Sequence, residues 1–210
     1  MAIKKNKQGV IMIKKILAVF AISIAVGVTG LAFSNEPEWI SVYELHANTL
    51  SGDDLSYDVQ ASYRCSALAV VTSIMFLTDN PELSEQLAEL AIKRAGNALM
   101  LSGLISKKRG ADVDPYQYVG DTDFIISVMQ QPRSQDLMTT YGNWSAYSAE
   151  TTGNFLELLE DELSACKDLD AYADLQANLY LRNSVLDMVR AMGLSEDEID
   201  ELMKDAPPLP

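Results

Sequence analysis

Two cysteines and one histidine are the residues of this chain whose types most often carry chemistry: Cys65, Cys166 and His46. A thiol can act as a nucleophile, bind a metal or form a disulfide. The sequence has no CxxC pair, so neither a redox motif nor a zinc site is supported. Each cysteine lies on an apolar helical stripe. We therefore expect a disulfide between Cys65 and Cys166, with two inert buried thiols as the alternative.

The single histidine restricts the kinds of enzyme that the chain could be. A Ser-His-Asp or Cys-His arrangement would have to use His46, and its neighbours in "YELHANT" include no evident nucleophile. We expect His46 to be a partly exposed surface residue. The chain also lacks Glu-x-x-His pairs for a metal centre in a helical bundle and a glycine-rich loop for phosphate. The sequence therefore favours a protein that is not an enzyme, and it predicts no cofactor.

Carboxylates acting alone are the remaining route to catalysis. Paired acids are common in a chain with 30 Asp and Glu residues. The densest group lies on a predicted helix, on what looks like its solvated face: Glu157, Glu160, Asp161 and Glu162. A carboxylate-based enzyme stays as an alternative.

Aromatic residues gather in the least regular part of the sequence, residues 112–147. They are interleaved with Asp, Asn, Gln and Ser, a mixture that stacks on sugars or fills the centre of a protein interface. Large aromatics also cover the ends of helical bundles, which is the plainer explanation. The candidate ligand or partner surface comprises Tyr116, Tyr118, Tyr141, Trp144 and Tyr147.

Four aspartates in the same section form a weak candidate for a calcium site. Oxygen ligands in a flexible loop suit Ca²⁺, but the EF-hand spacing fails because Tyr116 and Gln117 stand where an Asp or Asn and a Gly are expected. Helix caps and turns explain such aspartates equally well. The candidates are Asp112, Asp114, Asp121 and Asp123.

Helical periodicity runs through most of the chain, and strand-like alternation is nearly lacking. We expect an all-α fold, a single helical bundle of about four main helices with short inserted helices. Asn80 and Pro81 have the types of a helix N-cap and first helical residue, and Gly193 that of a helix end. The expected helices are 37–50, 55–78 as the most buried one, 81–109, 124–130, 149–192 with a possible restart near 170, and 195–204.

The first 34 residues have the pattern of an export signal. Five lysines precede an apolar stretch from Ile16 to about Val28, and small residues follow it. We expect cleavage after Ala32 or Ser34, giving a periplasmic or secreted domain over 35–210 with a short extended tail, "PPLP". The alternative is an uncleaved inner-membrane anchor formed by residues 16–33, at the lower limit of a membrane span.

Net charge limits the partners of the exported part. The whole chain carries −14, and without the five leader lysines 30 acids face 11 bases, a net charge of −19. Such a surface repels nucleic acid and anionic membranes. We expect contact with the membrane only through the N-terminal segment, and a protein or small-molecule partner in the bacterial envelope.

The last predicted helix carries an apolar stripe formed by Leu194, Ile199, Leu202 and Met203. The stripe either docks on the protein itself or is presented to a partner. Taken together, the sequence predicts an exported acidic helical protein that binds or accompanies another envelope component. A small-molecule or sugar-binding protein using residues 112–147 is the alternative.

Overall fold

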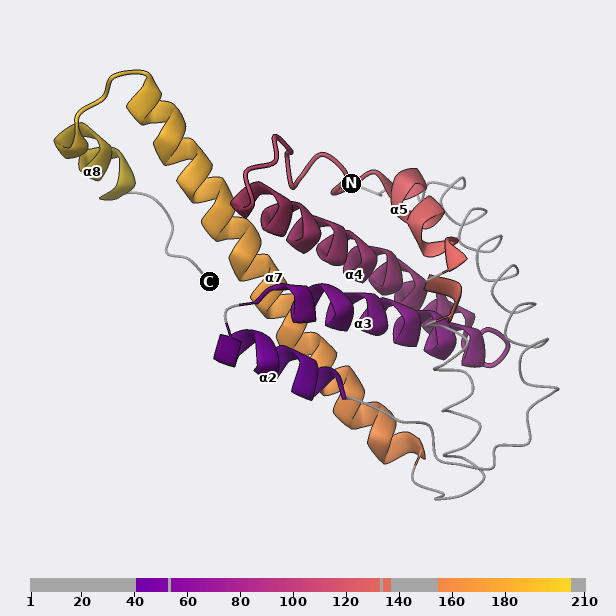
Figure 1. Cartoon of the computed structure of the whole chain (residues 1–210). Helices are drawn as coiled ribbons and strands as arrows, with labels where there is room; N and C mark the ends of the chain where they lie inside the picture. The colour runs from indigo at the N-terminus through magenta and orange to yellow at the C-terminus, as the bar shows by residue number, and fades with distance from the viewer. Residues whose placement is uncertain (1–40, 53, 133, 137–154, 205–210) are drawn as a thin grey trace. The chain divides into compact units, whose positions relative to one another are not determined.

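The computed structural model of the chain describes residues 41–52, 54–132, 134–136 and 155–204 (Figure 1). These residues form helices joined by turns, and no strand occurs among them, so the predicted all-α class is confirmed. They group into two compact units, one ending at Leu169 and one starting at Asp170. The helices are α2 (Val42–Gly52), α3 (Ser56–Met75), α4 (Pro81–Lys108), α5 (Thr122–Met129), α7 (Phe155–Ala191) and α8 (Glu196–Lys204).

Helix α3 is the buried centre of the first unit, as its apolar sequence predicts. It lies against α2 on one side and α4 on another (Figure 1). Small residues let α3 and α4 approach closely enough for hydroxyl groups to reach the backbone of the neighbouring helix. The Ser66 hydroxyl donates to the Ala91 carbonyl at 2.8 Å, and the Ser73 hydroxyl donates to the Ser84 carbonyl at 2.6 Å.

Local signals place the ends of α4 as the sequence predicts. The Asn80 side chain accepts a hydrogen bond from the Leu83 amide at 3.1 Å, and Pro81 is the first helical residue. Lys107 and Lys108 lie in the last turn, where positive charge complements the helix dipole. Gly110 follows with φ = +86°, a conformation that glycine adopts without strain.

Several helix ends differ from the expected ones, most clearly those of α2 and α3. Helix α2 continues to Gly52 instead of stopping at Leu50, and α3 ends at Met75 instead of Thr78. After Met75 the Phe76 amide donates to the Thr72 carbonyl at 3.2 Å, and the Leu77 amide donates to the Ile74 carbonyl at 3.2 Å. The second, three-residue bond tightens the last turn and ends the regular helix.

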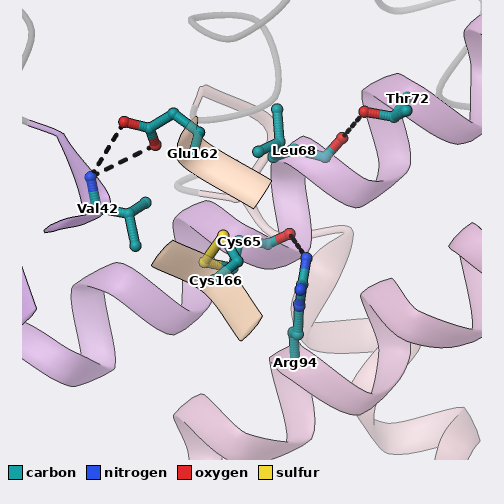
Figure 2. Close-up of a disulfide and its surroundings, with 7 residues drawn as sticks. All are labelled: Val42, Cys65, Leu68, Thr72, Arg94, Glu162 and Cys166. Carbon is teal, nitrogen blue, oxygen red and sulfur yellow. Dashed lines mark hydrogen bonds between the residues drawn. A yellow bond between two sulfur atoms is a disulfide. The ribbon is translucent and has the colours of Figure 1, made fainter. Parts of the chain in front are cut away.

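The disulfide between Cys65 and Cys166 is present, as predicted, and joins α3 to α7 (Figure 2). The two Cα atoms are 5.6 Å apart, and both cysteines are fully buried. Arg94 of α4 reaches the same part of the core, where its guanidinium donates to the Cys65 carbonyl at 3.4 Å. The disulfide therefore joins two cysteines that are 101 residues apart in the sequence, within the most buried region of the first unit.

The second unit contains the end of α7 and the short helix α8. Helix α7 runs without a restart from Phe155 to Ala191, and Gly193 follows it with φ = +87°. Ser195 and Glu198 form the predicted capping box: the Ser195 amide donates to the Glu198 carboxylate at 2.8 Å, and the Glu198 amide donates to the Ser195 hydroxyl at 3.4 Å.

Candidate functional site

The aromatic candidates fall partly within the described residues. Tyr116 is half-buried, and Tyr118 stacks on Phe124 with their ring centroids 4.1 Å apart. Tyr141, Trp144 and Tyr147 lie outside the described residues. A ligand surface made of all five candidates stays a prediction.

Contact with α4 positions the loop that carries Tyr116 and Tyr118. Pro115 of this loop lies directly on Gly103, where an added Cβ would come within 2.7 Å of the Pro115 Cα. A side chain at position 103 would push the loop away from the helix. Glycine is therefore required for the observed position of these two tyrosines.

The aspartates of the calcium candidate have local roles in the backbone. Asp114 accepts a hydrogen bond from the Tyr116 amide at 2.9 Å, and Asp121 caps α5 by accepting from the Phe124 amide at 3.0 Å. Asp112 and Asp123 are exposed. Within the described part of the chain, no three or more His, Cys, Asp or Glu residues are grouped in a way that could hold a metal ion.

A buried carboxylate pairs with the single histidine, which sequence patterns did not reveal. His46 of α2 lies with its Nδ1 2.9 Å from Oδ1 of Asp58 on α3, and the Asp58 side chain is fully buried. Burial raises the pKa of Asp58 above its ordinary value of 3.8, while the contacts with His46 and Thr49 oppose this rise. Oδ2 of Asp58 has no hydrogen-bond partner among the described residues. The His46 side chain is only 16% exposed, and the pair joins α2 to α3. We therefore interpret it as a structural contact at the edge of the core.

The variant Asp58→Asn tests the raised pKa. The folded protein binds the Asp58 proton more tightly than the unfolded chain does, so the group's contribution to stability falls as pH rises from about 4 through its folded pKa. Asn carries no such proton. Hence the free energy of unfolding of the variant, relative to the wild type, should increase between pH 4 and pH 7 in urea titrations followed by circular dichroism.

The exposed residue Asp112 provides the matched control for this experiment. Asp112→Asn changes an exposed side chain, so its effect on the unfolding free energy should be small, about 0.5 kcal/mol or less. A difference for Asp58→Asn that does not change with pH would contradict the raised pKa.

One acid of the 157–162 cluster occupies a buried position. Glu160 and Asp161 are exposed as expected, but Glu162 is 5% exposed, so a solvated position is wrong for it. Its carboxylate accepts from the Val42 amide at 3.2 Å, which places a negative charge at the N-terminus of α2 (Figure 2). Glu162 therefore holds α2 against α7 within the first unit.

A hollow of about 470 Å³ lies beside Glu162. Its walls are mostly oxygen-bearing side chains from the start of α2 and from α7. Asp161 and Asp168 are exposed to water there, whereas the Glu162 carboxylate accepts the hydrogen bond from the Val42 amide. The lining residues are Ser41, Tyr43, Asp161, Glu162, Ser164, Ala165 and Asp168.

The strongest candidate for a binding surface is an apolar face of α7 in the second unit. Its four side chains are 47–70% exposed and follow one another at intervals of four, three and four residues. This spacing keeps them on one side of the helix, along about 16 Å of its axis. Single exposed leucines are ordinary, whereas an aligned apolar strip marks an interaction site. We name these residues, Leu181, Val185, Met188 and Met192, the α7 face.

The apolar stripe of α8 is at least partly covered. Ile199 is 3% exposed and Leu194 is half-buried, while the side chains of Leu202 and Met203 lie outside what the structure describes. Burial of Ile199 fits the expectation that this stripe docks on the protein itself. Among the described side chains of the second unit, the large exposed apolar ones are thus on α7.

Comparisons with protein-family models, with curated proteins and with solved structures find no match for this chain. Among the described helices, none has the length and apolar character needed to cross a membrane. The buried disulfide fits a protein of an oxidising compartment.

Proposed function

We propose that this chain is an exported accessory protein of the bacterial envelope that binds a protein partner through the α7 face. The observation that carries the proposal is the alignment of four large exposed apolar side chains on one side of a helix. Exposing such a strip to water costs free energy that a partner would recover on binding. The four residues are spaced four, three and four apart, which is the spacing of apolar residues at the contact between two helices packed side by side.

Three further features support a role outside the cytosol. The leader pattern of residues 1–34 favours export, the disulfide is typical of an oxidising compartment, and the acidic exported part disfavours nucleic acid as a partner. We place the protein in the periplasm, where a disulfide-stabilised helical protein can accompany another envelope component.

Export is tested by the mass of the protein isolated from the periplasm of bacteria that express the whole chain. We expect the N-terminus at Phe33 or Asn35, because signal peptidase reads the small residues just before these positions. A protein that keeps residues 16–33 in the membrane fraction would replace export of a free domain with anchoring.

Binding at the α7 face is tested with a photo-crosslinking amino acid at position 188, and at Leu50 as the control. Leu50 is 64% exposed on α2, so it reports contacts that need only an exposed apolar residue. In native host cells we expect an adduct with a defined envelope protein from position 188 and none from position 50. Identical adducts from both positions, or none from position 188, would contradict the proposal.

A further inference from the structure

We infer that the partner of the α7 face is a basic amphipathic helix. This inference rests on the proposed function and adds the chemistry of the occupant. It follows from the shape of the α7 face, from the side chains that form it and from the charge around it.

The geometry of the α7 face favours a helix as its occupant. Its side chains repeat at the four-three spacing of a coiled-coil seam, which a neighbouring helix matches over about three turns. A strand would need an edge with free backbone groups, and α7 offers none along its length because its backbone is bonded within the helix. Met188 and Met192 are flexible thioethers that adapt to different apolar partners.

The charge of the second unit selects a basic partner. Residues 170–204 contain eight acids and three bases. Arg190 is already paired with Glu196 at 3.1 Å and with Asp187 at 3.7 Å, and Lys204 is paired with Glu201. The second unit up to Lys204 therefore has a net charge of −5. An incoming helix with lysine or arginine beside its apolar face would be attracted to this unit.

The same charge disfavours a second copy of this chain and a lipid surface. Without the leader lysines each chain has a net charge of −19. Two copies would bring two such chains, and their two acidic α8 helices, together. Anionic lipid headgroups would meet the same repulsion. A cationic helix is the occupant that satisfies both the apolar strip and the surrounding acids.

Synthetic peptides test the inference directly. The probe is a fluorescein-labelled peptide of about 18 residues, long enough to cover the α7 face as a helix, with leucine on one side and lysine on the other. One comparison peptide has the same composition in scrambled order, and another has glutamate in place of lysine. Binding is measured by fluorescence anisotropy with the protein as isolated from cells expressing the whole chain.

We expect the lysine-leucine peptide to bind at least about tenfold more tightly than either comparison peptide, because only it offers both the apolar face and the opposite charge. The double variant Val185→Asp/Met188→Asp should weaken this binding by about tenfold or more. The matched variant Leu50→Asp adds a negative charge at an exposed apolar residue of α2, so it should leave binding unchanged.

Several results would overturn the inference. Equal or tighter binding of the glutamate-leucine peptide, lost in the double variant, would overturn the basic partner but leave the proposed protein-binding face intact. Equal binding of the lysine-leucine peptide to wild type and double variant would show attraction by charge alone. A wild-type dimer that the double variant abolishes in sedimentation equilibrium would make a second copy the occupant. A markedly lower melting temperature of the double variant would show that the chain itself covers this face.

Discussion

The double variant Cys65→Ala/Cys166→Ala is expected to lose about 3–5 kcal/mol of unfolding free energy. The bond closes a loop of about 100 residues, for which the chain-entropy model gives about 4.7 kcal/mol, more than for shorter loops. Both side chains are fully buried, so alanine also leaves a small unfilled volume. Urea titrations of the variant and of oxidised wild type, followed by circular dichroism, measure the difference.

Thiol labelling provides the control for the disulfide. Neither cysteine of the native protein should react with a thiol reagent, even in mild denaturant, and two should react after reduction in strong denaturant. A loss below about 0.5 kcal/mol, the usual size for a neutral surface change, would show that the bond adds nothing to the native fold.

Leu68→Ala is expected to destabilise the protein by about 3–5 kcal/mol. Leu68 is 1% exposed on α3, one turn from the disulfide (Figure 2), and belongs to the main hydrophobic core. The surrounding helices are tied together by the disulfide and by hydroxyl groups bonded to backbone carbonyls. They cannot collapse easily into the space left by the missing carbon atoms, which raises the cost of the cavity.

Met75→Ala, at the end of the same helix, is the matched control. Met75 is 48% exposed, so its truncation should change the unfolding free energy by about 0.5 kcal/mol or less. Comparable losses for the two variants would mean that α3 is not the buried centre of the first unit.

The predictions that succeeded rest on signals that act over a few residues or on one periodic face. Asn80 and Pro81 begin α4, and Ser195 with Glu198 begins α8, because side chains there satisfy the free amides of the first turn. The disulfide was predictable because two cysteines on apolar stripes, in a chain that begins with an export-signal pattern, have one pairing to make.

The buried acids were missed because their roles come from tertiary contacts. Asp58 lies three residues before Ala61 and seven before Cys65, on the stripe that α3 buries, and Glu162 lies four residues before Cys166 on the buried stripe of α7. An acid on the same stripe as a buried cysteine is the signal that could have identified both. Their partners, His46 and the Val42 amide, could not be named without the fold.

The apolar residues of the α7 face could be recognised in the sequence, but their exposure to water could not be predicted from it. Leu181, Val185, Met188 and Met192 read as part of a long amphipathic helix, and such a stripe normally faces a core. Only the exposed fractions separate a stripe that meets water from one that is covered. Exposure depends on which elements lie nearby, and periodicity carries no information about that.

The long-range sulfur bridge also alters what a protease can do to this protein. A single backbone cut anywhere between residues 66 and 165 leaves two pieces that are still covalently joined. The nicked chain would migrate as one species until a reductant is added, and its halves would stay at a high effective concentration for re-association. In a compartment rich in proteases, this topology gives the molecule tolerance to nicking that a linear chain with the same core lacks.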